Sequence, residues 1–210
     1  DAANADAKYL VKDNGDKDFF KAGDMHFVDR DGNHVIDAND RTVIGDPNPD
    51  IYGNIHTTAS WKNLTLTAVF NYSLGNDIFN YQRMLLEGGT YFLNQTTAMK
   101  SRWTTEGQQT AYPRAEYNDP MGNSRFSDRW IEDGSYLRMS NLTLSYYLPI
   151  QSTYLQGITI FGNVTNLFTI TKYLGSDPDC AIAGSILTQG IDRGLLGQGR
   201  SFSLGVNINL

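Results

Sequence analysis

The sequence predicts an all-β protein, an antiparallel transmembrane β-barrel segment of about five strands with long extracellular loops. Apolar and polar residues alternate without a break over residues 200–210, as expected for a strand with one apolar and one polar face. The apolar face of that strand holds Phe202, Leu204, Val206, Ile208 and Leu210. In addition, short and long connections alternate strictly between the predicted strands, which is typical of outer-membrane barrels.

Composition and charge exclude several classes of protein. The net charge of −6 argues against a nucleic-acid partner and leaves no basic patch for anionic lipid. Aromatic residues make up 12% of the chain, which is not a disordered composition. The chain has no run of about 18 apolar residues, so we expect no transmembrane helix. It begins at Asp1 without a signal peptide, and we expect a nicked, split or fragmentary chain.

The sequence holds no set of residues with the pattern of a catalytic site. A Ser/His/Asp set and a phosphate-binding loop are both missing, so we expect that the protein is not an enzyme. The single cysteine, Cys180, cannot form an internal disulfide and lies in an Asp-Pro-Asp-Cys turn rather than in a nucleophile motif.

Residues 29–40 have the spacing of an EF-hand-type calcium loop. Oxygen-bearing side chains fall at loop positions one, three, five, nine and twelve, and position seven offers a backbone carbonyl. The candidate Ca²⁺ ligands are Asp29, Asp31, Asn33, Val35, Asp37 and Asp40. His34 replaces the usual glycine, and Asp40 replaces the usual glutamate, as in dockerin-type loops. We therefore expect a weak structural site, and the alternative is a solvated acidic turn.

Residues 51–61 and 64–72 predict two strands joined by a tight turn at Lys62-Asn63. Trp61 lies near the turn and Tyr72 at the far end, and aromatic residues at both ends of apolar strands suit the two membrane interfaces. A short strand is also expected at residues 9–11.

A long loop follows at residues 75–128. Within it, residues 77–87 predict a helix capped by Asn76 or Asp77, and residues 96–103 predict a second helix. A loop of this length usually carries its own structure or a function.

Two more strands are predicted at residues 135–148 and 157–168, before a second long loop at residues 169–199. Leu137 and Met139 are out of phase with the later apolar residues of their strand, which predicts a bulge near Ser140. We divide the chain into an extracellular region with the acidic loop, 1–50, and C-terminal barrel strands, 51–210.

Five strands cannot close a barrel, and an open edge in lipid would leave backbone groups unpaired. The remaining strands must therefore come from elsewhere. If the C-terminus faces the periplasm, the acidic loop and both long loops lie outside the cell, where calcium is plentiful.

Three blocks of sequence, 29–50, 128–147 and 163–179, resemble the C-terminal end of the SusC/RagA family of TonB-dependent transporters, in the family's order. The resemblance implies a bacterial outer-membrane protein of Bacteroidetes with a 22-stranded barrel and an internal plug. It also implies energy from the TonB complex, contact with outer-membrane lipid and a SusD-like surface lipoprotein as partner. Such pairs import oligosaccharides or oligopeptides.

The main alternative is a soluble calcium-binding β module that binds a glycan or a protein partner. A protein that needs detergent for extraction would favour the transporter.

Overall fold

A computed structural model describes residues 7–12, 14–150, 152, 154–180 and 188–209. The chain forms two units, one made of Asp1–Ile44 and Asn80–Trp130 and the other of Gly45–Phe79 and Ile131–Leu210. The division predicted after residue 50, between an extracellular loop region and barrel strands, concerns placement relative to a membrane and stays a prediction. In the described residues, no helix is both long and apolar enough to cross a membrane.

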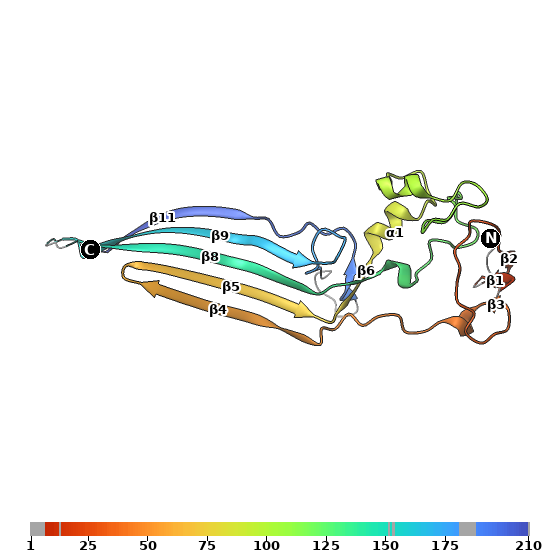
Figure 1. The fold of residues 1–210 in the computed structure, drawn as a ribbon, viewed down its shortest axis with the longest axis horizontal. Helices are drawn as coiled ribbons and strands as arrows, with labels where there is room; N and C mark the ends of the chain where they lie inside the picture. Colours follow the sequence, from red (N-terminus) through yellow and green to blue (C-terminus); the bar gives the residue numbers. More distant parts are fainter. Residues whose placement is uncertain (1–6, 13, 151, 153, 181–187, 210) are drawn as a thin grey trace. The chain divides into compact units, whose positions relative to one another are not determined.

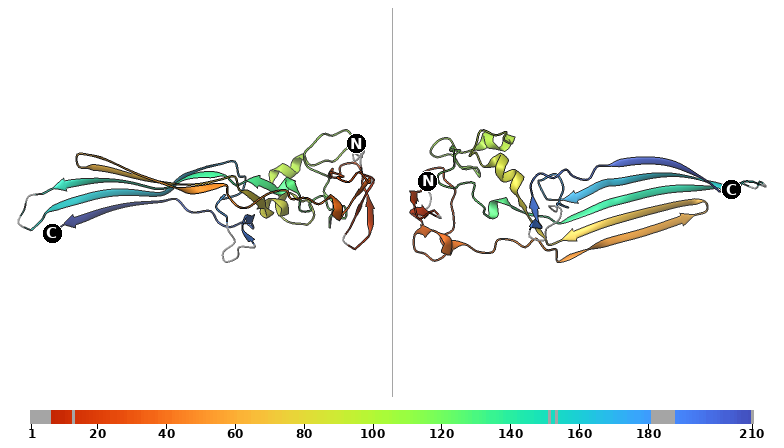
Figure 2. Two further views of the ribbon diagram at one scale, coloured as in Figure 1. Left: turned by 90° about the horizontal axis from the view of Figure 1, so that it is seen from below. Right: turned by 180° about the vertical axis from the view of Figure 1, so that it is seen from behind.

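Five long antiparallel strands dominate the second unit (Figure 1). They follow the sheet order β11-β9-β8-β5-β4, and Figure 2 shows this sheet edge-on as a single twisted layer. The strands are β4 (Ile51–Trp61), β5 (Leu64–Leu74), β8 (Tyr136–Pro149), β9 (Gly157–Thr171) and β11 (Ser201–Asn209). The predicted all-β, antiparallel fold of five strands is confirmed, and the sheet formed by the described residues does not close into a barrel.

The turn between β4 and β5 has the predicted two residues. Trp61 pairs with Leu64, so only Lys62 and Asn63 connect the strands. Lys62 adopts a left-handed backbone with φ of 55°, which a turn this short requires.

Bulges at one level of the sheet restore the apolar phase of β8. Val69 and Phe70 of β5 pair with Asn141 and Met139, so Ser140 is the extra residue, and its hydroxyl donates to the Val69 carbonyl oxygen at 3.1 Å. Beside it, β9 carries its own irregularity at Asn166, where φ is 50°. The predicted bulge near Ser140 is thereby confirmed, and Leu137 and Met139 rejoin the apolar face.

The sheet has one apolar face and one polar face. The apolar face leaves large side chains exposed on all five strands: Ile51, Ile55, Trp61, Leu66, Leu74, Leu137, Leu144, Tyr146, Leu148, Ile160, Ile170, Phe202, Leu204, Val206 and Ile208. Leu210 lies outside the described residues. Nothing in the described residues of this unit forms a second layer over the apolar face (Figure 2).

Side chains on the polar face form hydrogen bonds across the strands. Asn163 donates to Asn141 Oδ1 at 3.0 Å and to Thr143 Oγ1 at 2.7 Å. The Thr165 and Ser201 hydroxyls are 2.6 Å apart, which links β9 to β11. Short polar groups can satisfy one another in this way while still facing water.

A small sheet with the order β10-β6-β7 corrects the predicted helix at residues 77–87. Its strands are β6 (Asp77–Asn80), β7 (Ile131–Asp133) and β10 (Ile191–Asp192). The four residues of β6 alternate between partly buried and buried, and Ile78 is fully buried. This alternation suits a strand, so the helix α1 (Tyr81–Glu87) begins later, with Asn80 as its N-cap. The second long loop is also shorter than predicted, because β9 continues to Thr171.

The first unit contains a small sheet with the order β2-β1-β3. Its strands are β1 (Tyr9–Val11), as predicted, β2 (Lys17–Phe19) and β3 (Val35–Ile36). Its core consists of Ala7, Leu10, Ile36 and Met121, with Phe20 and Phe27 packed against it. The unit also holds three short 3₁₀ helices: η1 (Ala38–Asp40), η2 (Thr97–Ser101) and η3 (Asp128–Trp130). The helix predicted at 96–103 is thus the 3₁₀ helix η2.

Candidate metal centre

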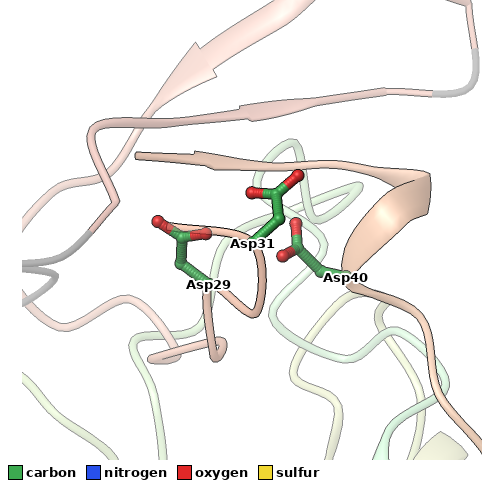
Figure 3. A group of neighbouring side chains, drawn as sticks. All are labelled: Asp29, Asp31 and Asp40. Atoms are coloured by element: carbon green, nitrogen blue, oxygen red, sulfur yellow. The ribbon is translucent and has the colours of Figure 1, made fainter. Parts of the chain in front are cut away.

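Three carboxylates of the acidic loop converge on one space (Figure 3). Asp29, Asp31 and Asp40 each offer an oxygen, and these atoms all lie within 4.8 Å of one another. Calcium binds oxygens at about 2.3–2.6 Å, so ligands on opposite sides of the ion lie about 5 Å apart. The spacing of these three groups therefore fits a Ca²⁺ ion.

Backbone N–H groups hold these carboxylates in place. Asp29 accepts hydrogen bonds from the N–H groups of Gly32 and His34, both at 2.8 Å. Asp40 accepts from the N–H groups of Arg30 and Asp37, at 2.7 and 2.8 Å. Asp40 thereby ties the end of the loop to its beginning.

The remaining predicted ligands have other local roles. Asn33 accepts from the Val35 N–H at 2.8 Å, and Val35 pairs with Tyr9 in the small sheet. Asp37 lies outside the three-carboxylate group and caps η1, where its carboxylate accepts from the Asn39 N–H at 2.6 Å. The loop thus brings together the ligands of positions one, three and twelve.

The backbone at His34 is left-handed, with φ of 66°. Glycine adopts this conformation without strain, and His is among the residues that tolerate it. The conformation directs the His34 N–H to Asp29. Partial desolvation acts to raise the pKa of Asp29, but the hydrogen bonds from His34 and Gly32 outweigh it, so this pKa lies below its ordinary value. Asp29 is therefore anionic at neutral pH.

A second cluster, which the sequence did not predict, lies on the polar face of the large sheet. Arg138 of β8 is buried there and forms ion pairs with Asp177 and Asp179. The only sequence feature that pointed to this cluster was a single arginine in a strand of small polar and apolar residues. The acidic turn that pairs with it comes about forty residues later. Strand periodicity does not reveal which distant loop folds onto which strand.

Cys180 lies beside this cluster and shows no features of a nucleophile. Its side chain is half-buried, and burial together with the charge of Asp192 raises the pKa of its thiol to about 12. The thiol is therefore protonated at neutral pH, and a protonated thiol is a poor nucleophile.

Comparisons with known proteins relate the chain to outer-membrane receptors. No family model matches the chain. It is 34% identical over 202 residues to the TonB-dependent receptor P3 of Formosa agariphila, which covers 92% of this chain and 19% of that receptor. It is 26% identical over 186 residues to the TonB-dependent receptor SusC of Bacteroides thetaiotaomicron, covering 87% of this chain and 17% of SusC.

Solved structures show the same relationship. The RagAB peptide importer in its closed-closed state matches with a TM-score of 0.70 and 27% identity, over 87% of this chain and 20% of the matched chain. A further RagAB peptide transporter structure matches with a TM-score of 0.69 and 28% identity, over 82% of this chain and 19% of the matched chain. The chain spans about a fifth of the length of these relatives.

Proposed function

The chain belongs to the SusC/RagA family of TonB-dependent outer-membrane transporters, and from this premise we propose that it forms part of the barrel wall of a nutrient importer. The observation that carries the proposal is the exposed apolar face that runs across all five strands, opposite a face of hydrogen-bonded polar groups. A wall between lipid and a water-filled passage needs these two faces. In the soluble alternative, the same apolar side chains would face water.

The edges of the sheet support a larger assembly. Among the described strands, β4 and β11 each pair on one side only. In lipid, each unpaired backbone group would cost several kcal/mol, so we propose that the remaining strands of a 22-stranded barrel pair with these edges. The same assembly would supply the plug that the TonB complex engages.

We propose oligopeptides or oligosaccharides as the imported nutrient, with a SusD-like surface lipoprotein as partner. The likeness to a RagAB peptide importer favours peptides. Because the chain is also similar to SusC, we keep oligosaccharides in the proposal. The test is uptake of labelled oligopeptides and of labelled oligosaccharides by cells with and without the whole receptor. Uptake of one class that requires both the receptor and an energised inner membrane supports the proposal. If the deletion strain takes up both classes as well as the native strain does, the proposal is contradicted.

The long loops, 75–128 and 169–199, are predicted to lie outside the cell, and the turn at Lys62 in the periplasm. We expect an impermeant thiol reagent to label Glu106→Cys on intact cells, because Glu106 is exposed in the first loop. Lys62→Cys, at the short turn, is the matched control and should react only after the outer membrane is opened.

The experiment is read in a strain without the surface lipoprotein, because a lid over the loops would also block the reagent. Native Cys180 gives little background, since its thiol is half-buried and its pKa is raised. Labelling of Lys62→Cys but not of Glu106→Cys on intact cells would reverse the predicted orientation.

We also propose that the acidic loop holds one structural Ca²⁺ ion, with Asp29, Asp31 and Asp40 as the core ligands. Convergent carboxylates repel one another unless a cation neutralises them, and these three offer oxygens within 4.8 Å of one another. Three carboxylates supply at most six oxygens, and both oxygens of Asp29 and of Asp40 already accept backbone N–H groups, so Asn33, the Val35 carbonyl, Asp37 or water would complete a shell of six to eight oxygens.

Calcium should therefore order the loop. At a calcium concentration roughly five times the dissociation constant, binding should stabilise the loop by about 1 kcal/mol, with a dissociation constant of about 10⁻⁴–10⁻³ M. The measurement is amide exchange of residues 29–40 in the whole receptor, in millimolar calcium and in chelator. Asp29→Ala should abolish the calcium-dependent difference, and Asp16→Ala, an exposed carboxylate outside the loop, should keep it. Equal protection in calcium and in chelator would identify a solvated turn.

A further inference from the structure

We propose that Arg138 is the positioning residue of a latch that fastens the segment between β9 and β11 to the polar face of the sheet. The strap is defined as residues 173–180 and 188–199, and the latch as Arg138 with Asp177, Asp179 and Gln198. The latch can be tested without any transport. If the polar face lines the import passage, as the proposed function has it, the strap borders that passage, and only this point rests on the proposed function.

Arg138 directs each arm of its guanidinium group to a different partner. Its Nε donates to the Thr169 hydroxyl of β9 at 3.1 Å. Its Nη2 forms an ion pair with Asp177, and its Nη1 lies 3.5 Å from an Asp179 oxygen. The Arg138 side chain is only 3% exposed, so these interactions are shielded from solvent on the arginine side.

The two aspartates connect Arg138 to both ends of the strap. Asp177 accepts from the Gln198 N–H at 3.0 Å, and the Gln198 side-chain amide donates to Asp179 at 3.3 Å. One guanidinium group therefore holds residues that are about twenty positions apart. Burial acts to raise the pKa of Asp177, but hydrogen bonds from Gln198, Asp179 and Arg138 outweigh it and keep the carboxyl group ionised.

Tyr173 and Pro178 of the strap are buried, but two of its leucines are not. Leu174 is 72% exposed and Leu196 is 98% exposed. An open cavity of about 280 Å³ lies between the strap and the strands, and its lining includes Arg138, Thr169, Gly175 and Gly197. The direct ion pairs of Arg138, beside this cavity, are therefore a main attachment of this part of the strap.

A second fastening joins Tyr173, at the start of the strap, to Asp192, near its middle. The buried Tyr173 hydroxyl donates to Asp192 at 2.5 Å, and Asp192 is 1% exposed. The Phe79 N–H donates to the Gly190 carbonyl oxygen at 2.7 Å. Loss of the Arg138 latch should therefore free residues 174–180 and 194–199, while the part around Asp192 stays in place.

Cys180 is a native reporter for this opening, because it is half-buried and follows Asp179 directly. In the whole receptor in detergent, Arg138→Gln should raise the rate of maleimide labelling of Cys180 at least about tenfold, since it leaves two carboxylates without their cation. Arg200→Gln is the matched control, because Arg200 lines the same cavity and, among the described residues, its hydrogen bond is to the Asn166 carbonyl oxygen of β9, at 3.4 Å, rather than to the strap. Labelling is followed by mass spectrometry of the peptide that contains Cys180.

Graded variants separate a latch from a general loss of stability. Arg138→Lys keeps the positive charge but loses the planar guanidinium group that binds several partners at once. The labelling rate of Cys180 in this variant should therefore fall between the rates in the native receptor and in Arg138→Gln. Asp177→Asn should open the strap more than Asp179→Asn, because the Asp179 side chain is 47% exposed and the Asp177 side chain 12%. The unfolding temperature of the barrel should be unchanged in the four latch variants and in the Arg200→Gln control.

Three results would overturn the latch. They are an unchanged Cys180 rate in Arg138→Gln, an equal increase in Arg200→Gln, and an increase that appears only together with a lower unfolding temperature. None of these results bears on nutrient uptake, so they leave the proposed import function standing.

Discussion

Leu204→Arg should destabilise the folded receptor in a bilayer by about 2–4 kcal/mol, because it places a cation on the lipid-facing side of β11 near the bilayer midplane. Leu204 is the fourth residue of a nine-residue strand and is 82% exposed. Its partner on the adjacent strand β9 is Gly162, which has no side chain to shield the new charge. The measurement is the free energy of unfolding in phospholipid vesicles.

Ser203→Arg is the depth-matched control, because Ser203 precedes Leu204 and points to the polar face, where it pairs with Asn163. Asn207→Arg is a second control on that face. Both should cost less than about 1 kcal/mol, since an arginine there extends into water. Equal tolerance of arginine at positions 203 and 204 would contradict the membrane assignment and return the soluble β module as the better explanation.

The sequence alone predicted the faces of the strands because a strand's side-chain period of two is a local property. Five strands were located, and the phase error at Leu137 and Met139 marked the bulge at Ser140. The strand β6 was missed, since its four residues are also compatible with the first turn of a helix. Only its pairing with β7 and β10 decides the outcome, and that pairing joins residues far apart in the chain.

The same distinction applies to the sites. Asp29, Asp31 and Asp40 occupy positions one, three and twelve of an EF-hand-type loop, and this local spacing was enough to predict that they converge. Asp37 was expected to join them, but a nearby N–H of η1 competes for its carboxylate. The partners of Arg138 could not be predicted, because Asp177 lies 39 residues away and strand periodicity says nothing about the folding of loops.

The packing of Trp130 gives the largest stability prediction for the unit made of residues 1–44 and 80–130. Trp130 is 0% exposed, and its indole N–H donates to the Arg125 carbonyl oxygen at 2.9 Å. The guanidinium carbons of Arg83 and Arg129 lie 5.3 and 4.8 Å from its ring, and Arg83 donates to the Arg129 carbonyl oxygen. The indole thus provides a surface on which two cations of this unit stack.

Trp130→Ala should therefore cost about 3–5 kcal/mol, from the cavity and from the loss of both cation–π contacts. Amide exchange should rise throughout residues 81–130, while the strands of the large sheet keep their protection, because they belong to the other unit. Trp130→Phe is the matched control. It keeps a ring for the two arginines and loses the hydrogen bond to Arg125, so about 1–3 kcal/mol should be lost. Native-like amide exchange in Trp130→Ala would mean that hydrogen-bonded loops hold the unit together rather than the packing of Trp130.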